Sequence, residues 1–260
     1  MKKTVFFGAG LCGEKAYDLF KDEFDVICFI DNSVSKQGTN FCGLPVYPPD
    51  KLADIEFDRL FITAILDIDG MHSQLLSLGV DDKKIHDDFY LLFSKSRELC
   101  LNRIAETVYE YNLPGQVAEA GVYKGSFSKI INRNFPDRIV HLFDTFDFAG
   151  NNFEELKRKL LNESRYPQNY VIHKGFFPNT AKDLDETFCF VSVDMSVYDA
   201  NLNALIYFYP RLVEQGIILI HDYFCEKVGV KQIVADYGKM IGQRLKIVPI
   251  GDDYSIAIVK

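Results

Sequence analysis

Strand-like and helix-like segments alternate along almost the whole chain of 260 residues, and this alternation limits the fold more than any other feature. Strands that alternate with helices predict an α/β protein with a parallel sheet. In the first part of the chain, the expected strands lie at 3–8, 25–30, 58–65 and 83–87, and the expected helices at 12–22 and 70–79. The stretch 31–50 is rich in turn residues, and we expect it to be irregular.

A long helical candidate at 89–112 leads into a second α/β series. This series has five strand–helix units and ends in two strands around "GDDY" (251–254), which is typical of a hairpin turn. The layout is similar to the sheet of class I methyltransferases. We therefore predict two α/β domains: a small Rossmann-like half-domain at 1–90 and, at 91–260, a class I S-adenosylmethionine-dependent methyltransferase fold with a C-terminal β-hairpin.

Composition and charge exclude several classes of protein. The chain has 29 Lys+Arg against 37 Asp+Glu, so it lacks the basic surface that nucleic-acid binding requires. Its apolar runs are far shorter than the roughly 20 residues of a membrane span, and the basic pair at its start is followed by a strand pattern rather than a signal peptide. We expect a cytoplasmic protein whose six scattered cysteines are free thiols.

The first strand is followed by a G-x-G-x-x-G turn made by Gly8, Gly10 and Gly13, and Asp31 ends the next apolar run. This pattern is a dinucleotide-binding fingerprint. It keeps open an NAD-dependent sugar-nucleotide oxidoreductase. A match to the Tyr-x-x-x-Lys pair that a short-chain dehydrogenase needs, Tyr17 and Lys21, lies in the first helix instead of after a later strand.

A second glycine turn, "EAGVYKGS", starts at Glu119 and enters a helix at Ser126. Glycines let a ligand approach the backbone, and a helix N-terminus attracts anionic groups. One interpretation is a seat for the methionine part of S-adenosylmethionine, and the other is an ordinary strand-to-helix turn. The candidate cofactor-binding residues here and after the next two strands are Glu119, Gly121, Tyr123, Gly125, Ser126, Asp144, Thr145, Gly175 and Phe176.

Asp144 ends the second strand of this series, where a carboxylate commonly binds ribose hydroxyls. Asp194 ends the fourth strand, and His221 and Asp222 end the fifth. Because ligands bind at the carboxyl ends of parallel strands, we expect Asp194, His221 and Asp222 to converge near the glycine turn. Two carboxylates and an imidazole can hold a divalent cation.

Residues from about 93 to 260 resemble the macrocin O-methyltransferase family. The resemblance rests on "LPGQVAEAGVYKGSFS", "LFDTF", "KGFFPNT", "VDMSVYDANLNALIYFYPRL" and "IILIHDY", which follow the order of the family's motifs. It implies S-adenosylmethionine-dependent methylation of a sugar hydroxyl, assisted by Mg²⁺ or another divalent cation, with Asp194 and Asp222 as metal ligands. The chain departs from the family pattern at two carboxylates, since His221 and Ser196 stand where the family has Asp.

The resemblance leaves the role of His221 open between a third metal ligand and a general base. Residues 1–90 resemble the N-terminal domain of bacterial sugar O-acyltransferases through "GAGLCG", "CFIDNS" and "GLPVY". That implies a nucleotide-sugar site or a scaffold around Gly8, Gly10, Gly13 and Asp31. We expect a small-molecule sugar or glycan-precursor substrate and a homo-oligomer, a dimer. A non-catalytic nucleotide-sugar-binding protein remains a third alternative.

Overall fold

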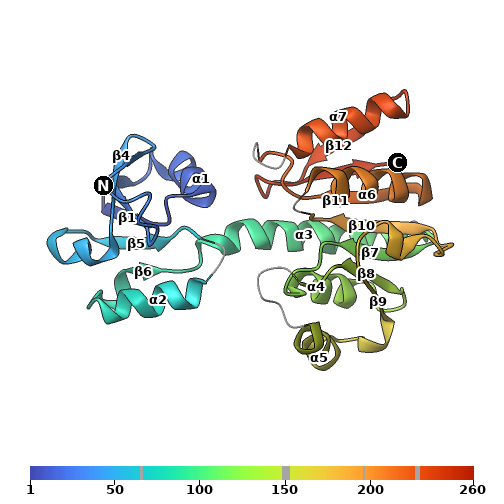
Figure 1. Cartoon of the computed structure of the whole chain (residues 1–260), viewed down its shortest axis with the longest axis horizontal. Helices are drawn as coiled ribbons and strands as arrows, with labels where there is room; N and C mark the ends of the chain where they lie inside the picture. The colour runs from blue at the N-terminus through green and yellow to red at the C-terminus, as the bar shows by residue number, and fades with distance from the viewer. Residues whose placement is uncertain (65–66, 148–152, 196, 226–228) are drawn as a thin grey trace. The chain divides into compact units, whose positions relative to one another are not determined.

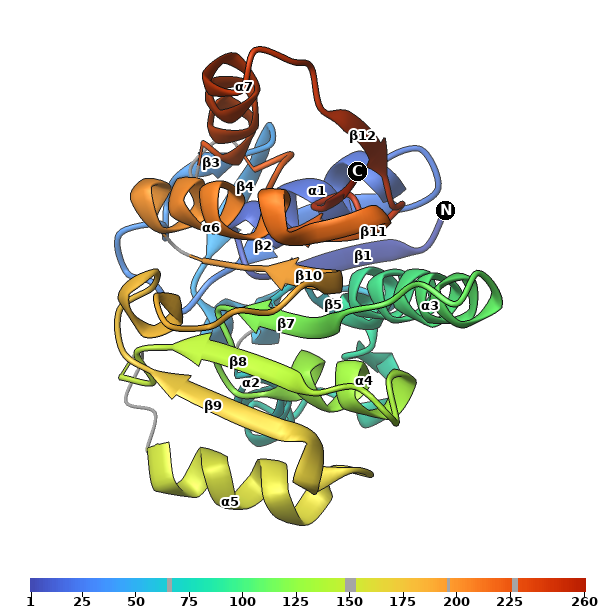
Figure 2. The ribbon, with the colours of Figure 1, turned by 90° about the vertical axis from the view of Figure 1, so that its right-hand side faces the viewer.

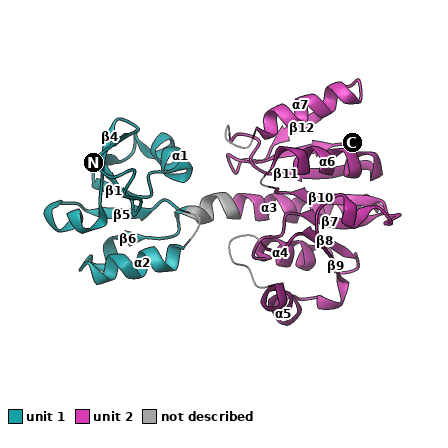
Figure 3. Ribbon diagram, viewed as in Figure 1, with its two compact units in different colours: residues 1–92 teal, residues 93–260 magenta. Residues whose placement is uncertain are grey.

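The computed structural model describes residues 1–64, 67–147, 153–195, 197–225 and 229–260, except the side chains of 90–94. The chain divides into two compact units, unit 1 at 1–92 and unit 2 at 93–260, coloured teal and magenta in Figure 3. Helix α3 (Phe89–Glu110) starts in unit 1 and continues into unit 2. Among the described residues, no helix is both long and apolar enough to cross a membrane.

Unit 1 is built around a six-stranded sheet with the order β3-β4-β2-β1-β5-β6 (Figure 1). Its central strands β1, β2 and β5 pair in parallel and supply the buried core of the unit. The strands are β1 (Lys3–Phe7), β2 (Asp25–Ile30), β3 (Asn40–Phe41), β4 (Leu44–Tyr47), β5 (Arg59–Ile62) and β6 (Ile85–His86), and the helices are α1 (Leu11–Phe20) and α2 (Ile68–Ser77).

The expectation that 31–50 is irregular was wrong over part of its length. Strands β3 and β4 form a tight antiparallel hairpin there, and β4 pairs in parallel with β2. The turn between them contains Cys42 and Gly43, both with positive φ. The sequence pattern for these strands was weak because β3 has two residues and β4 contains Pro45, which has no backbone N–H to donate to a neighbouring strand.

Unit 2 contains a seven-stranded sheet with the order β12-β13-β11-β10-β7-β8-β9. All neighbouring strands pair in parallel except at β13, which runs antiparallel to β11 and β12 and so forms the predicted C-terminal hairpin. The strands are β7 (Gln116–Ala120), β8 (Val140–Asp144), β9 (Tyr170–Lys174), β10 (Phe188–Val193), β11 (Leu212–Ile220), β12 (Lys246–Pro249) and β13 (Ile256–Val259).

Helices cover both faces of this sheet (Figures 1 and 2). The central strand β10 is buried at all six positions, as a strand covered on both sides must be. Phe188 and Val191 belong to the core shared with α6 and α7, whereas Phe190 belongs to the core shared with α3, α4 and α5. These helices are α4 (Ser126–Asn134), α5 (Phe153–Glu163), α6 (Tyr198–Arg211) and α7 (Val230–Met240).

The strand order reverses beside β7, because the chain passes from β7 to β8 on one side and later returns to β10 on the other. Crevices at such switch points, outside the carboxyl ends of the strands, are where open α/β sheets bind ligands. The second glycine turn directly follows β7. The fold therefore places this turn at the part of the sheet best suited to a ligand.

Candidate functional site

Backbone hydrogen bonds extend the parallel pairing one residue beyond the strands and bring three loops to the same edge of the sheet. The amide of Asp194 donates to Ala120 O at 2.8 Å, and the amide of His221 donates to Val193 O at 2.9 Å. On the other side of β7, the amide of Gly121 donates to Phe143 O at 2.9 Å. Gly121, Asp194 and His221 are therefore at corresponding positions just past β7, β10 and β11.

The structure brings Asp194, His221 and Asp222 together at this edge. Each offers one ligand atom, and these atoms all lie within 4.8 Å of one another. His221 Nε2 is 3.6 Å from Asp222 Oδ1, and both side chains are about one quarter exposed. The cluster therefore has the donor atoms, spacing and access of a cation site or of a general base beside two carboxylates.

The pKa of Asp222 is raised above its ordinary value. Burial is the largest cause, the positive charge of a protonated His221 acts in the opposite direction, and the nearby negative charge of Asp194 raises the pKa further. A positive partner would stabilise the ionised form of this half-buried carboxylate. A cation, or a substrate that brings positive charge, would serve as that partner.

Arg97 is the main residue at this site that the sequence did not reveal. Its guanidinium lies 3.3 Å from Asp194 Oδ2 and 4.5 Å from the ring centre of Phe127. Arg97 belongs to α3 and is 97 residues from Asp194 in the chain. No motif surrounds it, so only the packing of α3 against the β7–α4 region could have identified it.

Gly121 is required by the close approach of two strand ends. A Cβ atom there would lie 2.0 Å from the carbonyl oxygen of Asp194, and the residue has φ +92°. Gly125 precedes Ser126, the first residue of α4, and a Cβ there would lie 2.8 Å from the side chain of Leu160. Tyr123, between the two glycines, also has positive φ. At Gly121 the turn therefore contacts the loop that carries Asp194 through backbone atoms alone, without an intervening side chain.

Glu119 is a buried acid under this turn, with 3% exposure. Ser128 in α4 donates a hydrogen bond from its hydroxyl to Glu119 Oε2. Burial raises the pKa of Glu119 to about 8, while the hydrogen bond from Ser128 and the charge of Arg97 act in the opposite direction. Glu119 is therefore mostly neutral at pH 7, and a cation bound beside it would favour its ionised form.

Asp144, at the end of β8, ties its own loop to the glycine turn. Its Oδ2 accepts hydrogen bonds from Val122 N at 2.7 Å and Tyr123 N at 3.1 Å, and its Oδ1 accepts one from Phe146 N at 2.8 Å. The adjacent Thr145 donates its hydroxyl hydrogen to Asp147. Asp144 thus fixes the shape of the turn, and a carboxylate oxygen can accept a further bond from a ribose hydroxyl.

The loop after β9 places its two phenylalanines differently. Phe176 is 74% exposed. Phe177 packs in the core, with ring centres 5.4 Å from Phe143 and 5.3 Å from Phe208. Gly175 N donates to Asp144 O at 2.9 Å, which holds this loop beside the candidate ribose position. Phe176 is therefore available to cover a planar base, and Phe177 is not.

In unit 1, the first glycine turn has a similar plan. Asp31 Oδ2 accepts hydrogen bonds from Ala9 N at 2.8 Å and Lys36 Nζ at 2.9 Å, and Oδ1 accepts one from Ser33 N at 2.8 Å. Burial acts to raise the pKa of Asp31, but these three hydrogen bonds outweigh it, so the pKa lies below its ordinary value. The carboxylate thus already has a cationic partner within its own unit.

Protein packing explains two of the three glycines in this turn. A Cβ atom at Gly8 would lie 2.8 Å from Thr63 O, and one at Gly13 would lie 2.0 Å from Gly8 O. At Gly10, the nearest atom would be Lys36 Nζ at 3.8 Å, which is ordinary contact. Gly10 is therefore the position where open space remains for a ligand.

Ser196, at which the chain departs from the macrocin family pattern, lies outside the described residues.

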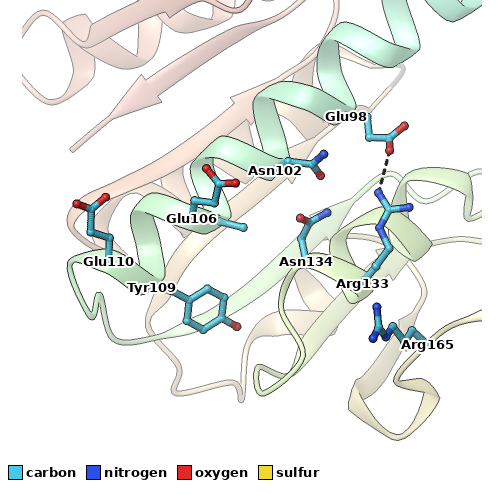
Figure 4. Close-up of a pocket in the computed structure, with 9 residues that line it drawn as sticks. Glu98, Asn102, Glu106, Tyr109, Glu110, Arg133, Asn134 and Arg165 are labelled. Atoms are coloured by element: carbon cyan, nitrogen blue, oxygen red, sulfur yellow. Dashed lines mark hydrogen bonds and ion pairs between the residues drawn. The ribbon is translucent and has the colours of Figure 1, made fainter.

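An open groove of about 870 Å³ runs along α3 and the C-terminal end of α4 (Figure 4). Glu98 and Arg133 form an ion pair across it at 2.8 Å, and Tyr109 also lines it. None of the predicted site residues lines this groove.

Two family models match parts of this chain. Residues 118–223, which include the second glycine turn and the Asp194–Asp222 cluster, match the family described as "Methyltransferase domain". Residues 1–86 match the family described as "C2185-like, N-terminal". No curated protein matches the chain.

Solved structures show the same fold. The O-methyltransferase NovP superposes with a TM-score of 0.56 at 20% identity, over 64% of this chain and 79% of NovP. CalS11, a TDP-rhamnose 3'-O-methyltransferase of calicheamicin biosynthesis, superposes in its apo form with a TM-score of 0.52 at 15% identity, over 74% of this chain and 93% of CalS11. Unit 2 therefore has the class I S-adenosylmethionine-dependent methyltransferase fold.

Proposed function

We propose that this protein transfers a methyl group from S-adenosylmethionine to a hydroxyl of a sugar or glycan precursor, with a divalent cation held by Asp194, His221 and Asp222. The observation that carries the proposal is the convergence of these three side chains at the carboxyl edge of a class I methyltransferase sheet. The sugar as substrate class is supported by the sequence motifs and by the fold shared with the TDP-rhamnose methyltransferase CalS11.

The second glycine turn is suited to hold the cofactor. Its backbone lies against the loop of Asp194, so the reacting end of the cofactor would lie close to the cluster. Glu119, Gly121, Tyr123, Gly125 and Ser126 surround its methionine part in this proposal. The ribose would lie at Asp144 and Thr145 and the base at Gly175 and Phe176, because these residues follow the next two strands, β8 and β9.

The donor set fits a divalent cation. Two carboxylates and one imidazole offer their ligand atoms within 4.8 Å of one another. Burial and the nearby charge of Asp194 raise the pKa of Asp222, and a bound cation would act in the opposite direction. Imidazole favours a softer ion than Mg²⁺, so Mn²⁺ is a reasonable alternative. A bound divalent cation supplies Lewis acidity, which lowers the pKa of a coordinated sugar hydroxyl.

The protein's own residues then orient the reactants and accept the proton. Because the cofactor supplies a methyl group that is already activated, positioning contributes much of the rate. Asp194 and Asp222 would hold the cation beside the acceptor hydroxyl, and Arg97 holds the Asp194 carboxylate in place by its ion pair. His221 is the third ligand or the base that takes the hydroxyl proton, since an imidazole nitrogen with a free lone pair can do either.

Unit 1 is the second part of the proposal. We infer that the turn with Gly8, Gly10, Gly13 and Asp31 is a scaffold or a nucleotide-sugar recognition site. Gly10 leaves open space beside the ammonium group of Lys36, as an anionic phosphate would require. The ion pair between Lys36 and Asp31 would have to loosen for such a ligand to bind.

Calorimetry with S-adenosylmethionine and the full-length chain tests whether the protein binds this cofactor. We expect saturable binding, and its absence would refute the methyltransferase proposal. Transfer of labelled methyl groups to a panel of nucleotide-sugars, with and without Mg²⁺ or Mn²⁺, tests the sugar acceptor and the need for a divalent cation. Asp194→Asn should lower turnover by more than about 100-fold while it retains cofactor binding, because it removes a ligand charge.

Asp199→Asn is the matched control for Asp194→Asn. Asp199 is an exposed acid in the first turn of α6, five residues from Asp194, and it is not part of the cluster. The control should keep wild-type turnover. Equal activity of Asp194→Asn and the wild-type protein would exclude Asp194 from the chemistry.

A further inference from the structure

A buried acid lies in the turn between β12 and β13. Asp252 is 2% exposed and Ser255 is 1% exposed, although the sequence suggested only a simple polar hairpin turn there. Buried carboxylates are costly unless their oxygens find hydrogen-bond donors. The partners of Asp252 therefore indicate why the acid is placed there.

Asp252 accepts three hydrogen bonds. Its Oδ1 accepts from Tyr254 N at 3.0 Å and from Ser255 N at 2.7 Å. Its Oδ2 accepts from the Ser255 hydroxyl at 2.6 Å. The two bonds to Oδ1 close a local turn of a common kind. The bond to Oδ2 is not needed for that turn, and it fixes the direction of the Ser255 hydroxyl hydrogen.

The fixed hydroxyl determines which nitrogen of His221 carries a proton. Ser255 Oγ lies 2.8 Å from His221 Nδ1. A hydroxyl has one hydrogen, and Ser255 donates it to Asp252, so its oxygen can only accept from His221. The Nδ1 atom must therefore carry hydrogen, and in the neutral ring Nε2 keeps its lone pair.

The free lone pair lies on the side of the candidate site. His221 Nε2 is 3.6 Å from Asp222 Oδ1, on the opposite side of the ring from Ser255. The ring of Tyr254 lies against His221, with centres 5.6 Å apart and a tilt of 32°, and limits rotation of the imidazole. Ring orientation and tautomer are thus both set by the segment 252–255.

Sheet topology explains how this segment reaches His221. Strand β13 runs antiparallel to β11, with Ile220 opposite Ile256. The residue after Ile220 is therefore opposite the residue before Ile256, which pairs His221 with Ser255. Figure 2 shows the C-terminal strands beside β11. The antiparallel end of the sheet thus brings supporting groups to a site formed by parallel strands.

We propose that Ser255 and Asp252 are positioning residues that hold His221 with Nδ1 protonated and Nε2 directed at Asp194 and Asp222, as a metal ligand or a base requires. This inference rests on the proposed function for its purpose, but the tautomer itself is a property of the protein without ligands. Supporting groups of this kind commonly orient histidine ligands through the second ring nitrogen.

Nitrogen-15 NMR of the imidazole rings tests the tautomer directly in the full-length protein. Spectra are recorded over a series of rising pH until the imidazole signals no longer change, so that the neutral ring is observed. His221→Asn assigns the signal among the five histidines. We expect the Nδ1-protonated form. A neutral His221 protonated mainly on Nε2 would overturn the proposal.

Asp252→Asn provides a test that does not depend on loss of folding. The amide oxygen takes the place of Oδ1 and keeps the two backbone hydrogen bonds, so the amide nitrogen faces Ser255 and donates to it. The hydroxyl hydrogen must then turn toward His221 Nδ1, and the tautomer should switch to Nε2–H. An unchanged tautomer in a folded Asp252→Asn protein would contradict the proposal.

Asp253→Asn is the matched control, because Asp253 is the adjacent exposed acid and asparagine tolerates its positive φ. It should leave the tautomer unchanged, and a shift as large as that of Asp252→Asn would contradict the proposal.

Ser255→Ala should weaken Mn²⁺ binding by about 10–100-fold and leave S-adenosylmethionine binding intact. Unchanged Mn²⁺ affinity with an unchanged tautomer would also contradict the proposal. Failure of methyl transfer itself would refute the proposed function and leave the NMR result standing.

Discussion

The two glycine turns of this protein share one plan but differ in what stands beside them. In both, an aspartate at the end of the next strand accepts hydrogen bonds from backbone amides of the turn: Asp31 from Ala9 and Asp144 from Val122 and Tyr123. Asp31 is also neutralised by Lys36. Among the described residues, Asp144 forms no ion pair, and its turn lies against the loop that starts with Asp194.

This difference shows that a glycine pattern by itself reports backbone geometry rather than chemistry. The first turn has the stronger fingerprint, yet Gly8 and Gly13 are accounted for by contacts with Thr63 and with the turn itself. The second turn has the weaker fingerprint, yet it adjoins the Asp194–Asp222 cluster. Chemistry depends on what neighbouring strands place at the turn.

The largest expected effect separates the glycines of the two turns. Gly121→Ala should cost about 1–3 kcal/mol from its positive φ alone, and the 2.0 Å approach to Asp194 O would also displace that loop. Gly10→Ala should cost no more than about 1 kcal/mol, because its Cβ enters open space. Urea unfolding and methyl-transfer assays measure both. Equal losses for the two variants would refute the contrast.

A smaller effect should separate the two aspartates. Asp144→Asn should weaken S-adenosylmethionine binding by about 10–100-fold, because an amide group cannot accept all three backbone hydrogen bonds that shape the turn. Asp31→Asn is the matched change in unit 1 and should leave that affinity unchanged. Calorimetry provides the comparison, and a larger effect of Asp31→Asn would assign the cofactor to the first turn.

The pH dependence of the free energy of unfolding should reveal the ionisation of Glu119, the buried acid under the second glycine turn. The pKa of Glu119 is about 8 in the folded protein and about 4.3 when exposed, so the folded state holds the proton more tightly. The free energy of unfolding should therefore fall as pH rises from about 4.3 through about 8. Glu119→Gln should remove this contribution, as measured by urea unfolding across that range. Parallel profiles for the two proteins would contradict it.

The smallest effect concerns unit 1, where His72 lies between two acids. Its Nε2 is 2.8 Å from Asp82 and its Nδ1 is 2.7 Å from Asp87, and these hydrogen bonds raise the pKa of His72 above 6.5. The stabilisation is present below about pH 6.5 and is lost as pH rises through the folded pKa. His72→Gln should remove it, by no more than about 1 kcal/mol.

Amide hydrogen exchange of α2, which carries His72, checks this last prediction. Protection of α2 in the wild-type protein should decrease as pH rises, after correction for intrinsic exchange, and should change less in His72→Gln. Glu119→Gln is the control from unit 2 and should leave the exchange of α2 unaffected. If it changed α2 as much as His72→Gln does, the two units could not be treated as separate in stability.

Much of the fold could be predicted from the sequence because buried parallel strands read as apolar runs. The alternation of strands and helices indicated the methyltransferase-type sheet, and the two strands around Gly251–Tyr254 do form the terminal hairpin. The β3–β4 hairpin was missed, since its strands have two and four residues and Pro45 interrupts the pattern. Short strands depend on their partners more than on their own sequence.

The sequence alone placed Asp194, His221 and Asp222 at one edge, because parallel strands share the direction of their carboxyl ends and each of these residues follows an apolar run. The tertiary structure alone decided what supports them. Arg97 comes from a helix, and Ser255 and Asp252 come from the turn before an antiparallel strand, and no sequence spacing links these residues to the site. Local pattern determines strand ends, whereas partners across a sheet are determined by its register.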